Sequence, residues 1–253
     1  MRERIIDYYE NYDEEGRLLR DKAHMPEYLT TIHYFDKLFV PHSTVLDVCA
    51  GTGRYAFYLA DKGHEVTACD LVEHHVAMIG AHTQADRLTD IRMCDVLDLS
   101  DFDDNAFDIV LCMGAIYHLR TAEEKAQAIS ECVRVCKPGG IVALAYITKI
   151  GMAFINMNHA LDNMGEILRI LDSTDDGLFR CDSPREIATL AETKGLQTLC
   201  NVGTDGISKL LQETINSATD EDFEKYMAYM YKTCEDESIL GTSLHGLYFG
   251  RKA

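Results

Sequence analysis

The chain lacks several features that would assign it to a particular class of protein. No apolar run approaches the roughly 20 residues needed to span a bilayer, and the polar start Met1–Arg4 does not lead into a signal peptide. Lysine and arginine number only 24 against 42 aspartates and glutamates, so the net charge is −18. Nucleic-acid binding depends on cationic side chains that neutralise phosphates. We therefore expect a cytoplasmic protein that has neither a nucleic acid nor a membrane as a partner.

The cysteines do not form the pattern of a disulfide framework. Their number, nine, is odd, and they are scattered through strand-like and helix-like segments, which fits a reducing compartment. Cys132 and Cys136 lie four residues apart in a helical pattern, but no second pair stands at the spacing of metal ligands. We therefore predict no metal site. Nothing in the composition indicates an oligomeric state.

Strand-like and helix-like segments alternate from Thr44 onward. The predicted strands are Thr44–Cys49, Glu65–Cys69, Ile91–Met93, Phe107–Met113, Ile141–Tyr146, Leu196–Val202 and Leu244–Gly250. Helical patterns cover residues 1–40, Tyr55–Asp61, Val72–His82, Ala122–Cys136 and Arg185–Lys194, and Lys137-Pro138-Gly139-Gly140 is a strong stop signal. Such alternation predicts an α/β fold whose parallel sheet has helices on both faces.

The length of 253 residues fits a single domain with insertions. We expect N-terminal helices over 1–40, a ligand-binding core over 41–147, and two helical insertions, 148–182 and 207–240. Each insertion could be structural padding or a lid over a site.

The most informative segment joins the first strand to the following helix. Gly51 and Gly53 form a tight turn that lets a ligand approach the backbone, and the next helix directs free N–H groups to the same place. Asp47 is a carboxylate near the end of an apolar strand, where burial is costly without hydrogen-bond donors. The same turn also fits the dinucleotide motif, with Asp70 as the ribose-binding acid, so a nicotinamide cofactor remains open here.

Three further features favour a different ligand. Asp47 suits an amino acid moiety, whose ammonium group needs an acceptor network. Asp95, after the third strand, can accept a hydrogen bond from an adenine amino group. The fourth strand, Phe107–Gly114, is followed by the Lys137–Gly140 stop.

With these motifs the chain resembles the class I S-adenosylmethionine-dependent methyltransferases. The matching residues are Asp47-x-x-x-Gly51-x-Gly53, Asp70, Cys94-Asp95, Phe107-Asp108 through Tyr117-His118-Leu119, and Val135-Cys136-Lys137-Pro138-Gly139-Gly140. The resemblance covers about residues 41–147 closely, and the tail is similar to an uncharacterised bacterial subgroup. It implies a Rossmann-like, seven-stranded, mostly parallel sheet of order 3-2-1-4-5-7-6, with the last strand antiparallel.

The resemblance also implies roles for individual residues. Asp47, Ala50, Gly51 and Gly53 would line the methionine part of S-adenosyl-L-methionine, Asp70 would hold the ribose, and Leu71 would lie against the adenine. Asp95 would meet the adenine amino group, Val96 the ring, and Met113 would lie beneath the sulfonium. In this family N-terminal tyrosines often close over the cofactor, which makes Tyr9 and Tyr12 candidates.

Methyl transfer needs an aligned acceptor, a dry pocket and sometimes a base. His118, just past the fourth strand, is the candidate base, although it could instead order its loop or touch the cofactor. Tyr117 and Tyr146 should face the same cleft. His245, in the last strand, is expected to be structural.

The acidic charge and the insertions favour a small-molecule acceptor, methylated on an O, N or S atom. The alternatives are a protein or RNA methyltransferase, a nicotinamide-dependent reductase, and a binding protein that senses the cofactor without turning it over. The sequence does not identify the acceptor.

Overall fold

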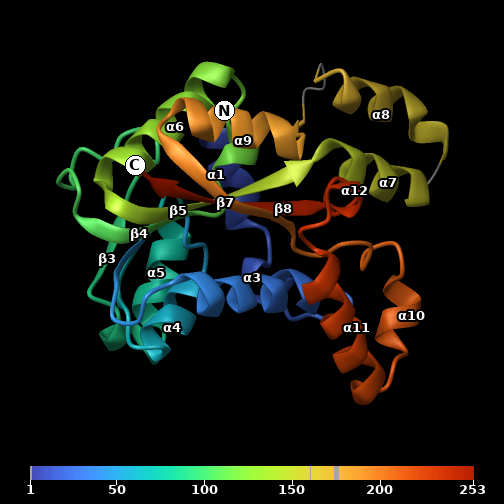
Figure 1. Cartoon of the computed structure of the whole chain (residues 1–253), viewed down its shortest axis with the longest axis horizontal. Helices are drawn as coiled ribbons and strands as arrows, with labels where there is room; N and C mark the ends of the chain where they lie inside the picture. The colour runs from blue at the N-terminus through green and yellow to red at the C-terminus, as the bar shows by residue number, and fades with distance from the viewer. Residues whose placement is uncertain (1, 160, 174–176) are drawn as a thin grey trace.

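The computed structural model describes residues 2–159, 161–173 and 177–253 (Figure 1). Its described residues form one eight-stranded sheet. The strands are β1 (Thr44–Asp47), β2 (Glu65–Asp70), β3 (Asp90–Met93), β4 (Phe107–Cys112), β5 (Cys136–Thr148), β6 (Cys181–Asp182), β7 (Leu196–Gly203) and β8 (His245–Lys252). Their order is β3-β2-β1-β4-β5-β8-β7, and the two-residue β6 pairs with β5. Strand β8 runs antiparallel to β5 and β7. Without β6, this is the predicted order 3-2-1-4-5-7-6.

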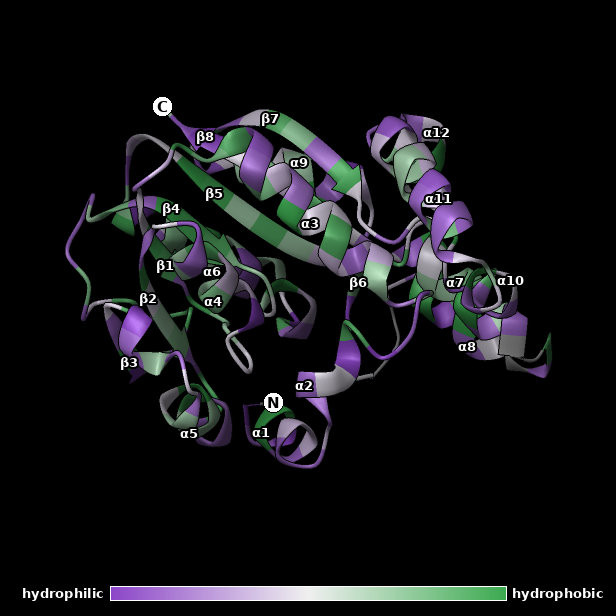
Figure 2. Ribbon diagram, turned by 90° about the horizontal axis from the view of Figure 1, so that it is seen from below, coloured by the Kyte–Doolittle hydropathy of each residue, from purple (hydrophilic) through white to green (hydrophobic). Residues whose placement is uncertain are grey.

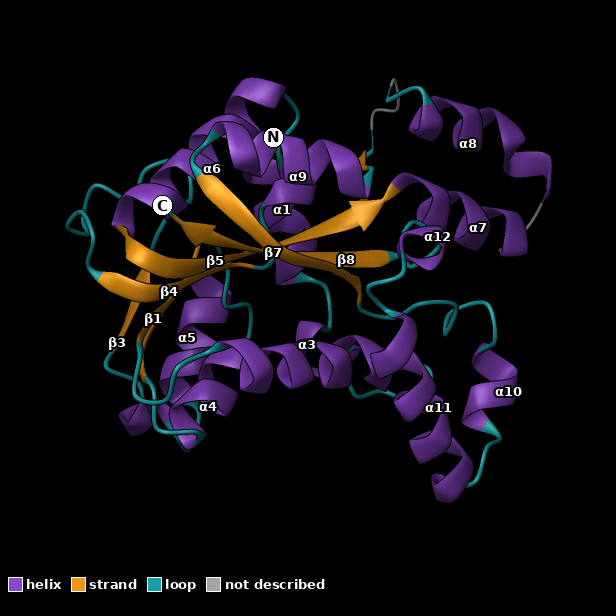
Figure 3. Cartoon of the chain, in the orientation of Figure 1, coloured by secondary structure: helices purple, strands orange, loops and turns teal. Residues whose placement is uncertain are grey.

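Helices cover both faces of the sheet, as Figure 3 shows. The helices are α1 (Arg2–Glu10), α2 (Glu14–Arg17), α3 (Met25–Leu38), α4 (Arg54–Asp61), α5 (Glu73–Ala81), α6 (Ala122–Val135), α7 (Lys149–His159), α8 (Met164–Leu171), α9 (Pro184–Thr193), α10 (Gln212–Asn216), α11 (Asp220–Thr233) and α12 (Glu237–Leu240). Short 3₁₀ turns lie at Ala85–Arg87, Ile116–His118 and Leu161–Asn163. Helices α3 and α4 lie on one face, and α6 and α9 on the other.

Local sequence explains where two of these helices begin. The side chain of Thr121 accepts a hydrogen bond from the N–H of Glu124, and the side chain of Glu124 accepts one from the N–H of Thr121. Ser183 and Glu186 make the same capping box for α9, and Pro184 occupies the first turn. Such boxes satisfy N–H groups that a helix start would otherwise leave unbonded.

The core is divided by the sheet into two layers. Successive side chains along a strand point to opposite faces of the sheet. Val110, Val142 and Leu144 point to the face covered by α6 and α9. Their neighbours Ile109 and Ala143 pack towards α3 and α4. In Figure 2 most of β5 is coloured as hydrophobic, as expected for a central strand that is buried on both faces.

Two predictions about element boundaries need correction. The Lys137–Gly140 segment ends α6 as expected, but β5 begins at Cys136 and runs through it rather than starting at Ile141. Cys136 already pairs with Phe107 of β4, and the register shifts before Ile109, so a bulge absorbs the glycines. The predicted helical stretch 207–240 is broken into α10, α11 and α12, with separate caps at Thr219 and Asp236.

The two predicted insertions extend beyond the carboxyl end of β5 (Figure 1). Helices α7 and α8 lie on the side of α6 and α9, and α11 contacts α3 on the other side. Residues 160 and 174–176 of the first insertion lie outside the described residues. Their role as lids stays a prediction. Within the described chain, no helix is both long enough and apolar enough to span a membrane.

Candidate cofactor and acceptor site

A cavity of about 260 Å³ lies at the carboxyl ends of β1 to β4. The first three strands contribute residues at or just after their carboxyl ends, which are Val48, Cys49, Gly51, Asp70, Leu71, Val72, Cys94, Asp95, Val96 and Leu97. The fourth strand contributes Met113, Gly114, Ala115, Tyr117, His118 and Leu119. Open α/β sheets bind their ligands at this edge, because the loops after adjacent parallel strands meet there. Of the predicted cofactor residues, Gly51, Asp70, Leu71, Asp95, Val96 and Met113 line the cavity.

The glycine turn has the backbone that the sequence predicts. Gly51 and Gly53 have φ values of 55° and 88°, a region that residues with a side chain rarely adopt. A Cβ atom on Gly53 would lie 2.8 Å from the ring of Phe57. Gly53 and Ala50 support the turn from behind and do not line the cavity. The turn therefore brings backbone, rather than side chains, to the ligand.

Asp70 fixes the shape of this turn. Its Oδ2 accepts a hydrogen bond from the N–H of Gly51 at 2.8 Å, and its Oδ1 accepts one from the N–H of Val72 at 2.9 Å. The Nδ1 of His75 lies 3.3 Å from the same Oδ1. Asp70 therefore joins the β1 and β2 loops while one edge of its carboxylate faces the cavity.

Asp47 lies behind the turn rather than in the cavity wall. Its side chain is buried, and its Oδ2 has no hydrogen-bond partner among the described residues. Burial, and then the nearby charge of Asp70, raise the pKa of Asp47 to about 8. The Nε2 of His75, a cavity residue, is also buried without a described partner. Asp47 Oδ2 and His75 Nε2 are thus two buried polar atoms whose hydrogen-bond partners are not supplied by the described residues.

Helix α1 covers the cavity. Tyr9 lines it and bonds through its hydroxyl to Nε2 of His118 at 3.0 Å, and Arg2 lies 3.5 Å from Oδ2 of Asp95. Tyr12, which we predicted to close over the cofactor, does not line the cavity. Because α1 ends at Glu10, Tyr12 falls in the following turn and stacks on Tyr8 with ring centroids 5.1 Å apart.

Of the three predicted catalytic residues, two line the cavity and Tyr146 does not. Tyr117 and His118 line the cavity, but both ring nitrogens of His118 are engaged, since Nδ1 lies 3.2 Å from the carbonyl oxygen of Leu178. Burial lowers the pKa of His118 to about 4, so the imidazole is a weak base. These contacts favour the alternative role of His118, in which it orders the loop and holds α1.

The prediction that Tyr146 faces the cleft is wrong. Its side chain is fully buried in the core layer of α6 and α9, and its hydroxyl donates to Oδ1 of Asn201 at 2.8 Å. Tyr146 shares the parity of Val142 and Leu144 on β5. Its ring lies over Gly246 of β8, where any Cβ atom would collide with it.

Helix α2 supplies two cavity residues that the sequence analysis missed, Glu14 and Arg17. Arg17 Nε donates to Glu14 at 2.8 Å, and its Nη1 donates to both carboxylate oxygens of Glu27 at 2.7 and 2.9 Å. Burial disfavours the charge of Arg17, but Glu27 and Glu14 outweigh it and raise the pKa of Arg17. A four-residue helix has no periodic pattern that would have revealed these side chains.

The cysteines also depart from expectation. Cys69 and Cys94 form a disulfide that joins the ends of β2 and β3. Each stands directly before a cavity acid, Asp70 or Asp95. The sequence predicts no framework of disulfides, and it did not reveal this single pair, which closes a loop of 25 residues beside the cavity.

Comparison with known proteins identifies this arrangement. Residues 46–144 match the protein family described as a methyltransferase domain. This segment of the chain is a methyltransferase domain, and S-adenosylmethionine is its cofactor. This separates it from the nicotinamide-dependent reductases that share the glycine turn. The two buried unpartnered atoms and the acids at the ends of β2 and β3 fit this cofactor, which carries an amino acid, a ribose and an adenine.

Individual relatives are distant. The chain is 26% identical over 155 residues to a ubiquinone biosynthesis O-methyltransferase of Thiobacillus denitrificans, covering 61% of this chain and 64% of that protein. The enzyme of the same description from Nitrosomonas europaea is 26% identical over 175 residues, or 68% and 72% of the two chains. The match thus spans about two thirds of these relatives. The fold is shared with the 1,6-didemethyltoxoflavin-N1-methyltransferase of Burkholderia thailandensis, at a TM-score of 0.58, 18% identity and coverage of 98% and 86%.

Proposed function

We propose that this protein transfers the methyl group of S-adenosylmethionine to a hydroxyl oxygen of a small metabolite. The observation that carries the proposal is the cavity at the ends of β1 to β4, walled by Asp70, Asp95 and the Gly51 turn. The choice of oxygen rests on the curated relatives, which are described as O-methyltransferases. The choice of a small acceptor rests on the acidic composition and on helices α1 and α2, which contribute residues to the cavity wall.

Residues of this chain would hold each part of the cofactor. Asp70 would bind the ribose hydroxyls, and Asp95 with Val96 would bind the adenine. The Gly51 turn, with Asp47 behind it, would receive the methionine part. When bound, the cofactor supplies a methyl group on a positively charged sulfur, which a nucleophile can displace.

The remaining task of the protein is to align the acceptor and exclude water. Tyr9 and Tyr117, which line the cavity, and Phe179 contact the ring of His118, with the Phe179 ring centroid 5.1 Å from that of His118. An apolar enclosure favours a reaction in which positive charge disappears, because the ground state loses more solvation than the transition state. Alignment alone can be worth an effective molarity on the order of 10⁵ to 10⁸ M.

The proposal is tested by measuring S-adenosylhomocysteine release with a panel of catechols, other phenols, amines and thiols. We expect turnover with at least one phenol or catechol and none with the amines or thiols. Turnover with amines alone would replace oxygen by nitrogen as the acceptor atom. If the protein binds S-adenosylhomocysteine in calorimetry but turns over no acceptor of the panel, the better description is a cofactor-binding protein without transfer.

A further inference from the structure

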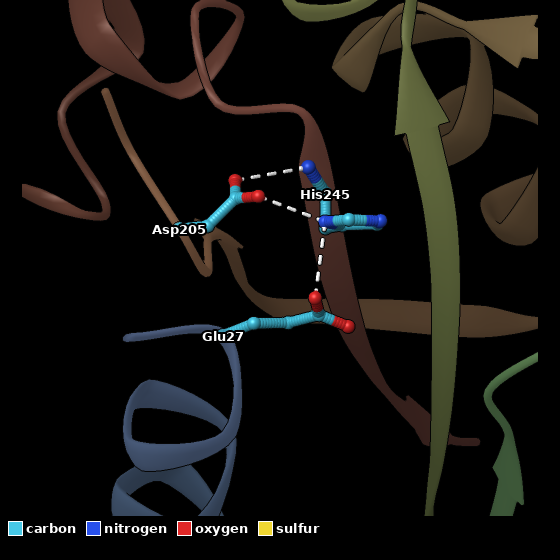
Figure 4. Close-up of side chains that lie close together, drawn as sticks. All are labelled: Glu27, Asp205 and His245. Atoms are coloured by element: carbon cyan, nitrogen blue, oxygen red, sulfur yellow. Dashed lines mark hydrogen bonds and ion pairs between the residues drawn. The ribbon is translucent and has the colours of Figure 1, made fainter. Parts of the chain in front are cut away.

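A second cluster of charged side chains lies at the carboxyl edge of the sheet (Figure 4). Glu27 lies in the first turn of α3, and His245 is the first residue of β8. Asp205 lies two residues after the end of β7. The Nδ1 of His245 lies 2.8 Å from Oδ2 of Asp205 and 3.2 Å from Oε2 of Glu27. Glu27 and Asp205, which are more than 170 residues apart in the sequence, thus place two carboxylates around one ring nitrogen of His245.

Both carboxylates are buried, Asp205 completely, and both are already satisfied by protein donors. Asp205 Oδ1 accepts hydrogen bonds from Ser243 Oγ at 2.6 Å and from the backbone N–H of His245 at 3.1 Å. Glu27 is paired with Arg17 through both oxygens. The cluster has the donor types of a metal site, but cationic and hydrogen-bonding groups of the chain occupy the positions that a metal ion would take. The arrangement therefore serves to orient His245.

The other ring nitrogen of His245 is directed elsewhere. In Figure 4 Nε2 points away from both carboxylates, towards the neighbouring strand β5. About a fifth of the His245 side chain is exposed, whereas Asp205 is not exposed at all. A buried carboxylate that holds Nδ1–H leaves the lone pair on Nε2, which is the arrangement of a general base.

His245 is also at the right place for an acceptor. It pairs with Ile147 at the end of β5, and β5 lies directly between β8 and β4. Two strand spacings, about 10 Å, therefore separate His245 from the line of β4, whose end forms the wall of the cavity. The His245 side chain extends from β8 towards β5 and covers part of that distance, so an acceptor hydroxyl lying in the remaining gap would be beside both Nε2 and the cavity. Arg17 connects the two places, because it lines the cavity and binds Glu27.

We propose that His245 is the catalytic base that takes the proton from the acceptor hydroxyl, and that Asp205 and Glu27 position it; this rests on the proposed O-methylation. The acceptor O–H bond breaks towards Nε2, and the oxygen electron pair forms the new C–O bond with the methyl carbon. The C–S bond breaks and its electron pair remains on sulfur, which becomes neutral. The proton stays on His245 until water removes it.

This assignment replaces His118, which has neither nitrogen available for an acceptor. His245 differs in having a carboxylate on one nitrogen and no described partner on the other. The proton that it receives creates an imidazolium beside Asp205 and Glu27, which stabilise that charge. The contacts of Nδ1 with Asp205 and Glu27 therefore orient the His245 ring and also increase its basicity.

The surroundings of His245 predict the direction of its titration. Burial would lower the pKa of His245, but Glu27 and Asp205 outweigh it and raise the pKa above 6.5, with Arg17 opposing them. Lys209 is a further cationic group near Asp205. A base must be neutral to act, so activity should rise with pH through a value above 6.5 and remain high beyond it.

Substitution of His245 tests the proposal with two acceptors of different acidity, 4-methylcatechol and 4-nitrocatechol. We expect His245→Gln to lower kcat/KM for 4-methylcatechol about 100-fold or more. The same substitution should lower kcat/KM far less for 4-nitrocatechol, because the more acidic hydroxyl of this compound ionises without a catalytic base. The rise of activity with pH should disappear, while S-adenosylhomocysteine affinity stays unchanged. His64→Gln, at the opposite edge of the sheet, is the matched control and should leave both measurements unchanged.

A second measurement needs no acceptor. In the S-adenosylhomocysteine complex of ¹⁵N-histidine-labelled protein, His245 should titrate above 6.5 with its proton on Nδ1, and Asp205→Asn should lower that value. Equal losses for both catechols, an unchanged pH profile in His245→Gln, or a titration unaffected by Asp205→Asn would each overturn the role of His245. Absence of turnover by the wild-type protein with every catechol and every other phenol of the panel contradicts the proposed O-methylation instead, and the titration then decides the state of His245 by itself.

Discussion

Asp70 both holds the loops of the cavity in place and lines the cavity. It holds the N–H groups of Gly51 and Val72, so the two loops that carry most of the cofactor wall depend on it. The same group borders the cavity where ribose hydroxyls are expected. Removing it should therefore affect affinity through lost ligand bonds and through a looser turn.

We predict that Asp70→Ala weakens S-adenosylhomocysteine binding about 10- to 100-fold, since hydrogen bonds to a charged group contribute about 1.5–3 kcal/mol. Isothermal titration calorimetry measures the change. Asp103→Ala, an exposed acid outside the cavity, should bind like the wild type. An affinity for the Asp70→Ala protein equal to that of this control would refute the ribose assignment.

His118 has a consequence for stability rather than for catalysis. Its pKa is lowered to about 4 by burial, whereas the unfolded chain has the ordinary value of 6.5. Between these values the unfolded state binds more protons than the folded state, so stability falls as the pH falls through this range.

We predict that the stabilising effect of neutral His118 is complete above pH 6.5 and is lost progressively down to pH 4. The shift corresponds to about 3 kcal/mol at the low end, by the conversion of 1.36 kcal/mol per pH unit. Urea unfolding at pH 7.5 and pH 5 would show a smaller drop in His118→Gln than in the wild type. The same drop in both proteins would show that another group is responsible.

At the scale of elements, the disulfide between Cys69 and Cys94 ties β2 to β3 beside the cavity. A link that closes 25 residues restricts the unfolded chain, and the chain-entropy estimate for such a loop is about 3 to 4 kcal/mol.

We therefore predict that a phosphine reductant lowers the unfolding free energy of the wild type by an amount of this order. Cys94→Ala should be less stable from the start and insensitive to the reductant. Cys200→Ala, which leaves the disulfide in place, is the control. A wild type whose urea midpoint does not change with the reductant would contradict a stabilising disulfide in solution.

Local patterns predicted the elements well and the long-range contacts poorly. The β1 strand, the Gly51–Gly53 turn and α4 could be predicted because neighbouring residues determine them. The strand order required the resemblance to a family, since alternation alone does not order strands. Tyr146 was misplaced because a shift of one residue along a strand moves a side chain to the other face.

The charged cluster illustrates what no local pattern contains. Glu27, Asp205 and His245 are ordinary surface-type residues in the sequence, and their meeting depends on α3, β7 and β8 reaching the same edge of the sheet. Arg17 is similar, because its partner Glu27 lies in the next helix. Sequence reasoning therefore predicted part of the cavity wall and did not predict the charged cluster.

At the scale of the whole molecule, the net charge of −18 bears on the kind of acceptor. Many of the cations are not available to a polyanion, because they are paired with carboxylates of the chain. Arg54 pairs with Glu15, Lys62 with Asp36, Arg87 with Asp61, and Arg134 with both Asp104 and Glu131. A surface of this kind repels a phosphate backbone rather than releasing counterions from it.

We predict that the protein does not bind fluorescein-labelled tRNA at 50 mM salt at protein concentrations up to about 10 µM, where nonspecific binding by a basic protein would begin to be visible. Fluorescence anisotropy measures it, and lysozyme, a basic protein, is the positive control. Binding that weakens steeply with added salt would mean that cations gather on one face despite the overall charge. That outcome would favour an RNA acceptor, and the helices beyond the end of β5 would then have to form an open surface rather than enclose a small molecule.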